Sequence, residues 1–140
     1  FRCTGGAAYV PRVSFAYLWG SEEYYEYVDS AFNDAFGFFL NGENIARIPD
    51  SDTDSDLVSI NNVNYYKNAR YFHGNDPSIE VVYHAIEADG FTSILTAEGA
   101  PRDDPQEWNT IKLAVGDVAD ELLDSWVLLE GATFTCRDAT

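Results

Sequence analysis

The sequence predicts an all-β protein, an antiparallel β-sandwich similar to a jelly roll, with one or two short helical turns. Segments rich in β-branched and aromatic residues recur along the chain, and several alternate between apolar and polar side chains, as half-buried strands do. Glycine and proline fall between these segments, where turns need them. A length of 140 residues suits one domain, here taken as residues 1–140.

The clearest predicted strand covers residues 13–19, in which Val13, Phe15, Tyr17 and Trp19 share one face. A second strand is closed by the turn signal Asn41-Gly42. The seven predicted strands are residues 13–19, 36–40, 58–63, 79–88, 91–97, 110–115 and 125–134. Only residues 23–32 and 118–123 have enough helical spacing to form a short helix or turn.

The charge is strongly negative, with 24 Asp and Glu against 8 Lys and Arg, a net charge of −16. Nucleic acids and anionic membranes are poor partners for such a chain, because like charges repel. Calcium, cationic partners or a high-salt habitat fit better, although acidity can also serve solubility alone. No apolar run reaches the roughly 18 residues of a membrane span, so no membrane insertion is expected.

The two cysteines, Cys3 and Cys136, lie near opposite ends of the chain. They could be two buried thiols. Terminal strands often lie side by side in a sandwich, however, and a disulfide there would close a loop of most of the chain, which favours a bond. A disulfide implies an oxidising compartment, so the sequence predicts a secreted protein.

Motifs for catalysis are scarce. His73 and His84 stand apart in sequence and outside metal-protease or hydrolase patterns, and no Gly-x-Ser-x-Gly elbow or glycine-rich phosphate loop occurs. Each histidine is interpreted as an ordinary surface or half-buried side chain. Pairs of carboxylates leave a glycosidase-like enzyme open, but with so many acids any pair is weak support. The sequence therefore predicts a protein that is not an enzyme.

Acidic and amide side chains gather where the predicted strands end. If β-hairpins join these strands, Glu22 and Glu23 lie beside Asp34, and Asp117 lies beside Asp124. Crowded carboxylates repel one another, and calcium relieves this by binding oxygen ligands. The alternative is that each acid caps a turn. The candidate calcium ligands are Glu22, Glu23, Asn33, Asp34, Asp117, Asp120 and Asp124.

A second candidate calcium site lies in one acidic loop. The alternation resembles the first half of an Asp-x-Asp-x-Asp calcium loop, but Ser55 stands where that loop has glycine and Asn61 where it has glutamate. A solvated acidic loop is the alternative. The residues concerned are Asp50, Asp52, Asp54 and Asp56.

A tyrosine-rich group forms a third candidate, a contact surface for a partner. Tyrosines in loops make binding surfaces, although part of such a group can belong to the core. Its members are Tyr24, Tyr25, Tyr27, Tyr65 and Tyr66, with Tyr71 and Phe72 nearby in sequence.

The run of residues 20–40, Gly-Ser-Glu-Glu-Tyr-Tyr-Glu-Tyr-Val-Asp-Ser-Ala-Phe-Asn-Asp-Ala-Phe-Gly-Phe-Phe-Leu, resembles the signature of the choice-of-anchor L domain. Shorter matches follow in the same order at residues 44–49, 58–64, 89–97, 111–120 and 124–131. The resemblance runs from about Val13 to Phe134. It departs from the family in the unusually acidic residues 50–56 and in carrying no anchor.

The resemblance implies an extracellular β-sandwich from a bacterial or archaeal surface protein, with no known catalytic role. Its polar signature positions fall on the seven candidate calcium ligands. The leading hypothesis is therefore a calcium-stabilised surface module that acts in adhesion or as a self-assembling subunit of a fibre or layer. Its partners would be a protein or glycan at a cell surface, or copies of itself. A glycan- or peptide-binding module that uses the tyrosine-rich loops is the alternative.

Overall fold

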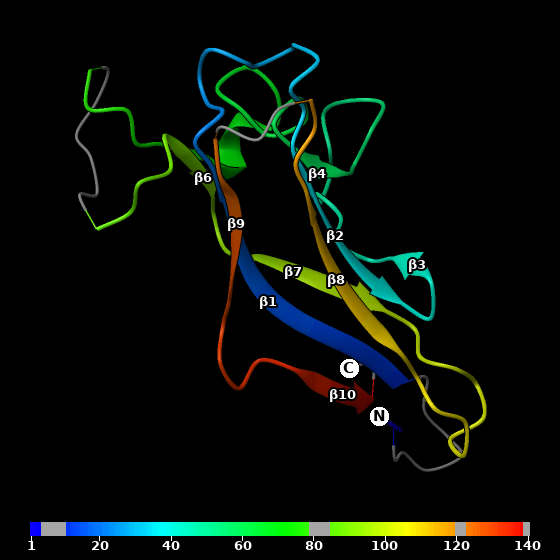
Figure 1. The fold of residues 1–140 in the computed structure, drawn as a ribbon. Helices are drawn as coiled ribbons and strands as arrows, with labels where there is room; N and C mark the ends of the chain where they lie inside the picture. The colour runs from blue at the N-terminus through cyan, green and yellow to red at the C-terminus, as the bar shows by residue number, and fades with distance from the viewer. Residues whose placement is uncertain (4–10, 79–84, 120–122, 139–140) are drawn as a thin grey trace.

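A computed structural model describes residues 1–3, 11–78, 85–119 and 123–138, which form two antiparallel β-sheets (Figure 1). A single turn of 3-10 helix, Ala69–Tyr71, is the only helical element of these residues. The strands are β1 (Pro11–Ser21), β2 (Ala35–Leu40), β3 (Glu43–Asn44), β4 (Val58–Ser59), β5 (Phe72–Gly74), β6 (Gly90–Thr92), β7 (Leu95–Gly99), β8 (Ile111–Gly116), β9 (Ser125–Leu129) and β10 (Thr135–Asp138).

The long strand β1 organises the first sheet. One of its edges pairs with β7 and then β6, and β6 also pairs with β5. The other edge pairs with β10 and then β9. A threonine side chain fills each junction: the Trp19 amide donates to the Thr92 hydroxyl at 3.1 Å, and the Ala16 amide donates to the Thr133 hydroxyl at 3.1 Å. On each edge of β1, two short strands thus pair with successive parts of its length: β7 and β6 on one edge, β10 and β9 on the other.

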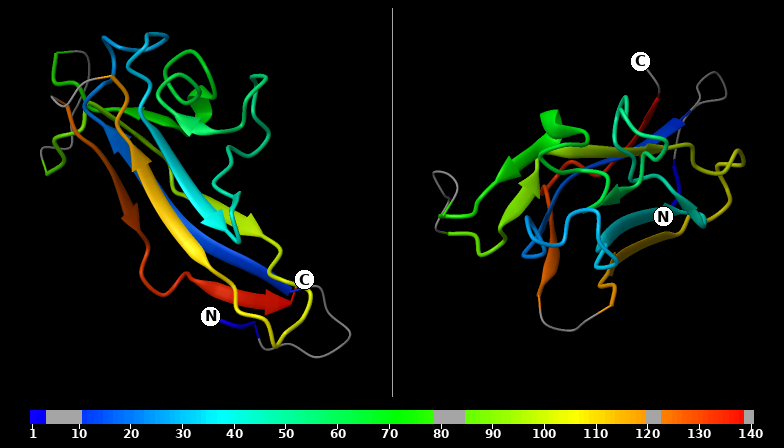
Figure 2. Two further views of the ribbon diagram at one scale, coloured as in Figure 1. Left: turned by 45° about the vertical axis from the view of Figure 1, so that its right-hand side comes forward. Right: turned by 90° about the horizontal axis from the view of Figure 1, so that it is seen from above.

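The second sheet is built on β2, which pairs with β8 on one side and with β3 and β4 on the other. The right-hand view of Figure 2 shows β2 and β8 as one layer and β1 and β7 as the other. Ring contacts cross the space between the layers: Tyr17 lies 4.8 Å from Phe36, and Phe15 lies 5.5 Å from Phe38, measured between ring centroids. The predicted β-sandwich is confirmed.

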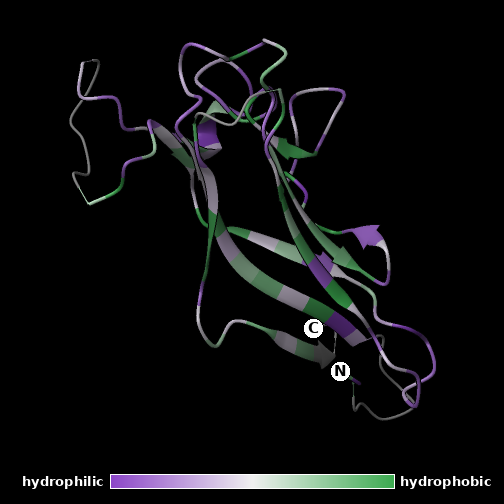
Figure 3. Ribbon diagram, viewed as in Figure 1, coloured by the Kyte–Doolittle hydropathy of each residue, from purple (hydrophilic) through white to green (hydrophobic). Residues whose placement is uncertain are grey.

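The core forms between the inner faces of the two sheets. Every second residue of β1 and β2 points inward, and Val13, Tyr17, Trp19, Phe36 and Phe38 are each no more than 2% exposed. Figure 3 shows hydrophobic residues mainly along the strands and hydrophilic ones in the loops at both ends. The end at which β1 finishes and β2 begins carries Glu22, Asp34, Asp117 and Asp124 and is called the acidic end below.

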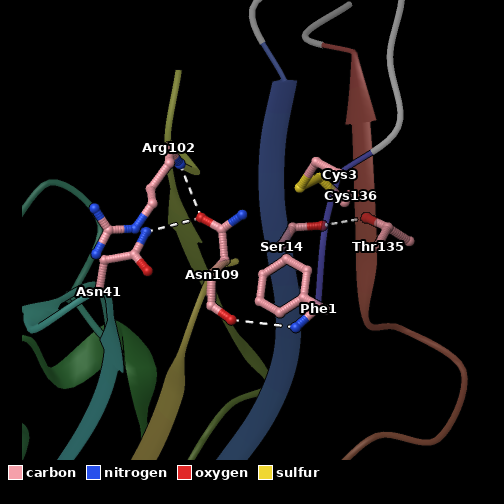
Figure 4. The surroundings of a disulfide bond; sticks show 8 residues. All are labelled: Phe1, Cys3, Ser14, Asn41, Arg102, Asn109, Thr135 and Cys136. Atoms are coloured by element: carbon pink, nitrogen blue, oxygen red, sulfur yellow. Dashed lines mark hydrogen bonds between the residues drawn. A yellow bond between two sulfur atoms is a disulfide. The ribbon is translucent and has the colours of Figure 1, made fainter. Parts of the chain in front are cut away.

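The opposite end holds the N-terminus and β10 (Figure 1) and is called the terminal end; Figure 4 shows the contacts around its disulfide. The predicted disulfide between Cys3 and Cys136 is present, with a Cα–Cα distance of 5.6 Å. The Phe1 ammonium donates to the Asn109 carbonyl at 3.1 Å, and the Phe1 ring packs edge-on against Phe134 at 5.2 Å. The first three residues are therefore attached to the sandwich through several contacts.

Several predicted element boundaries were wrong. Residues 91–97 contain parts of two strands, β6 and β7, because the chain turns between them. Residues 125–134 contain one strand, β9, which ends at Leu129; a break follows before β10, and Ala132 adopts a positive φ of 63° in it. Residues 58–63 form a strand only at Val58–Ser59, after which the Asn62 and Val63 amides bond back to Ser59. Of the short helix or turn predicted at residues 23–32, the structure has turns, over residues 22–29. Residues 79–84 and 120–122 lie outside the described residues, and 85–88 are not a strand.

Candidate functional site

The strand ends that carry the predicted ligands do meet at the acidic end, but through different neighbours than predicted. β2 pairs with β8 so that Ala35 opposes Gly116, which places Asp34 beside Asp117. β1 pairs with β9 so that Ser21 opposes Ser125, which places Glu22 beside Asp124. The predicted hairpins were wrong because successive strands here belong to different sheets.

Asp34 lies at the centre of this end and is fully buried. Its Oδ1 accepts a hydrogen bond from the Val118 amide at 2.9 Å, and its Oδ2 accepts one from the Ser125 hydroxyl at 2.7 Å. Asp34 precedes β2 in one sheet, whereas Ser125 begins β9 in the other. This carboxylate therefore ties the two sheets together and also holds the start of the segment that follows β8.

Glu22 and Asp124 form a reciprocal pair across the ends of β1 and β9. The Glu22 amide donates to the Asp124 carbonyl at 3.1 Å, and the Asp124 amide donates to Glu22 Oε2 at 3.1 Å. The neighbouring Glu23 is fully buried, and its amide donates to the Ser21 hydroxyl at 3.0 Å. Glu22 and Asp124 thus face solvent at least in part, whereas Glu23 belongs to the interior.

The remaining predicted ligands take separate roles. Asn33 Oδ1 accepts a hydrogen bond from the Asn61 amide at 3.0 Å and so connects two loops. Asp117 is exposed, and Asp120 lies outside the described residues. Among the residues that the structure describes, no three His, Cys, Asp or Glu side chains lie close enough together to hold a metal ion.

The pKa of Asp89 shows one effect of burying an acid in this acidic protein. Burial raises the pKa of Asp89 above its ordinary value, and the nearby carboxylates of Glu26, Asp76 and Glu22 raise it further. A raised pKa means that the ionised form of Asp89 is disfavoured in the folded protein. Of the candidate calcium ligands, Glu22 contributes to the repulsion that acts on Asp89.

The loop of the second calcium candidate is held by hydrogen bonds within the protein. Both carboxylate oxygens of Asp52 accept from the Asn68 amide, at 2.9 and 3.1 Å, and the Asp52 amide donates to Asn68 Oδ1 at 2.9 Å. Asp56 forms a 2.7 Å ion pair with Arg47. Asp50 binds Arg70 through its backbone carbonyl. Asp54 is exposed. Asp52 and Asp56 thus already have protein partners in this loop.

The tyrosine group divides between core and surface. Including Tyr24 in a contact surface was wrong, because Tyr24 is fully buried and its hydroxyl donates to the Val63 carbonyl at 2.5 Å. Tyr25 and Tyr65 rings lie 5.2 Å apart, and Tyr65 and Tyr66 rings 4.2 Å apart. Tyr66 is 74% exposed. Tyr27, half-buried, packs on Phe32 at 4.8 Å.

His73 takes part in ordinary surface contacts. His73 is exposed; its Nε2 hydrogen-bonds the Ser93 hydroxyl at 2.8 Å, and its ring stacks on Phe91 at 5.5 Å. His84 lies outside the described residues. In the described part of the chain, no helix has the length and apolarity to cross a membrane.

The sequence did not reveal the hydroxyl and amide groups that donate hydrogen bonds at the acidic end and hold its segments together. The Ser125 hydroxyl and the Val118 amide both donate to the buried carboxylate of Asp34. A serine next to an acidic residue is too common for its sequence position to reveal such a role. Only the pairing register of β1 with β9 and of β2 with β8 brings these donors to their acceptors.

Comparison with known proteins now identifies the family. No curated protein and no solved structure shows significant similarity to the chain. The family model of the choice-of-anchor L domain matches residues 7–135, which is nearly the whole chain. This chain therefore belongs to the choice-of-anchor L domain family, a family of cell-surface modules.

Proposed function

We propose that this domain is a non-catalytic, extracellular module of a cell-surface protein, that calcium stabilises its acidic end, and that it acts in adhesion or in assembly with copies of itself. The observation that supports the calcium part is that strand pairing places Asp34 beside Asp117, and Glu22 beside Asp124, at the same end of the sandwich. The disulfide and the surface family support the extracellular location. The described histidine and the carboxylates form no catalytic arrangement that argues for an enzyme.

Physical chemistry explains why a cation would help at this end. Burial raises the pKa of Asp89, and the carboxylates of Glu26, Asp76 and Glu22 raise it further. A divalent cation bound by Asp117 and Asp124, with Glu22 nearby, would offset repulsion among the carboxylates of the acidic end. Calcium is the suitable ion, because it accepts carboxylate and carbonyl oxygens in flexible geometry and needs no nitrogen or sulfur ligand. Because the ion would bind the folded state, it would raise the melting temperature.

The calcium part predicts a higher melting temperature in millimolar calcium than in excess EDTA, by several degrees at low ionic strength. Magnesium at the same concentration should give a smaller shift, because it demands a stricter octahedral geometry. Differential scanning calorimetry of the whole chain measures both. An equal melting temperature in calcium and EDTA would remove calcium from the proposal.

Two variants locate the ion. Asp124→Asn should abolish the calcium-dependent shift, because it removes an exposed carboxylate at the acidic end. Asp54→Asn, in the loop of the second candidate, should retain it. Glu98→Gln on β7 is the matched control for loss of one exposed negative charge. If Asp54→Asn abolishes the shift and Asp124→Asn does not, the ion binds the 50–56 loop instead.

The exposed tyrosines favour a second function, binding of a glycan or peptide. Tyr66 is 74% exposed yet held against Tyr65, and such rigid aromatic side chains make good contact surfaces. On a glycan and peptide array with calcium present, this function predicts binders whose signal falls at least about tenfold in Tyr66→Ala. Leu57→Ala, another exposed apolar residue, is the control. An array without binders would argue against this function.

A further inference from the structure

One side of the sandwich presents two unpaired strand edges. β8 pairs only with β2, and β9 pairs only with β1, so within the described residues each has one edge without a backbone partner. β8 and β9 contact each other and lie on the same side, which faces the viewer in Figure 1. Unpaired edges carry rows of free N–H and C=O groups that can bind another strand.

The core-facing side chains of these edges are poorly covered. Leu113 opposes Phe38 and Val115 opposes Phe36, so both point to the inner face of their sheet. Yet Leu113 is 40% exposed and Val115 is 41% exposed. On β9, Leu129 opposes the buried Tyr17 and is 46% exposed. Apolar side chains that belong to the core face thus remain in contact with water along this side.

β8 also lacks the usual protection of an edge strand. Proteins block edges with inward-pointing charges, prolines or bulges. Ile111–Gly116 contains no proline, and Lys112 is its only charged residue. Lys112 belongs to the outer face of the sheet, where its ammonium lies 5.9 Å from the Phe39 ring centroid. The edge and the inner face of β8 are therefore open to another strand.

We propose that β8 pairs antiparallel with β8 of a second copy of this chain. The observation that selects a second copy is charge. The chain carries a net charge of −16, so most contacts between two copies would oppose acid with acid. β8 contains no carboxylate, so two copies can approach there without that cost. This inference deepens the assembly part of the proposed function and does not depend on calcium.

Symmetry and side-chain direction then define the register. Opposed residues in an antiparallel pair share a face, and a two-fold axis at Ala114 satisfies this condition. Leu113 then opposes the partner's Val115 on the inner face, and each side chain covers the other. Lys112 opposes the partner's Gly116, next to the partner's acidic Asp117. The contact is small, so the dimer should be weak and should form only at high protein concentration.

A cysteine at the axis tests the register. Opposed Cα atoms in an antiparallel pair are about 4.5–5.5 Å apart, which lies within the range that a disulfide spans. Ala114→Cys should therefore form a covalent dimer under mild oxidation. Thr96→Cys, exposed on β7, is the matched control and should cross-link much more slowly. Equal cross-linking of the two variants would overturn the proposed pairing.

Sedimentation equilibrium over a wide concentration range tests the association itself. The wild type should pass from monomer to dimer, and Leu113→Lys should remain monomeric. Leu128→Lys is the control, because Leu128 is 55% exposed on the outer face of β9, opposite Leu18. A wild type that stays monomeric, or a Leu113→Lys protein that still dimerises, would overturn the proposal. The Ala114→Cys result decides the case if Leu113→Lys does not fold.

The same measurement in EDTA separates this inference from calcium binding. Dimerisation that persists in EDTA, with or without a calcium shift in melting temperature, supports the β8 contact. Dimerisation that needs calcium and survives in Leu113→Lys assigns assembly to the acidic end and overturns it. A dimer of wild type without preferential cross-linking of Ala114→Cys also overturns it, because the copies then meet at another surface.

Discussion

Replacing both cysteines, in Cys3→Ala/Cys136→Ala, is expected to lower the free energy of unfolding by about 5 kcal/mol. The disulfide joins residues separated by 133 positions, so its loss frees nearly the whole unfolded chain from a closed loop. Because domains of this size are stable by only about 5–15 kcal/mol, the loss would be a large share of the total. Urea denaturation of the oxidised wild type and the double variant measures it.

A matched control separates the bond from the packing around it. Ser14→Ala removes the 2.7 Å hydrogen bond from Ser14 to the Thr135 hydroxyl, which also joins β1 to β10, but leaves the disulfide intact. It should cost about 1 kcal/mol. Comparable losses in the two variants would show that contacts between the strands, rather than the constraint on the unfolded chain, hold the terminal end together.

The sequence allowed the core strands to be predicted because their signal is local. Alternation in residues 13–19 marks an inner face, and this segment is a strand with Val13, Tyr17 and Trp19 buried. Residues 36–40 also form a strand, with Phe36, Phe38 and Leu40 buried. The disulfide was also predictable, since only two cysteines occur and each lies near one end. These features depend on periodicity and position, both of which can be seen in a single sequence.

What could not be predicted depends on pairing between distant strands. Nothing local in residues 91–97 shows that they divide between two strands along β1 with Thr92 at the junction, or in residues 125–134 that the strand ends at Leu129 and that Thr133 lies at the junction with β10. The grouping of acids was predicted at one end, but with the wrong neighbours, because a hairpin and a strand that crosses to the other sheet have the same local pattern. Tyr24 was misassigned since burial of a loop tyrosine is set by tertiary packing.

Asp34→Ala is expected to lower the free energy of unfolding by about 3 kcal/mol when measured in excess EDTA. The substitution removes the acceptor of two charge-assisted hydrogen bonds, from the Val118 amide and the Ser125 hydroxyl, in a fully buried position. Asp34→Asn should cost less, because the amide oxygen still accepts from Val118. Asp54→Ala, an exposed acid, should change the free energy by less than about 0.5 kcal/mol.

A double-mutant cycle with Ser125→Ala shows whether Asp34 acts by joining the sheets. If it does, the two substitutions are strongly non-additive, with a coupling energy of about 1–3 kcal/mol. The charge lost in Asp34→Ala has the opposite effect on stability. Removing one negative charge from an end where carboxylates repel would by itself raise the free energy of unfolding. A measured loss therefore exceeds that gain and has to come from the broken hydrogen bonds. Additive effects would instead assign Asp34 a role without Ser125 and leave its carboxylate available to a cation.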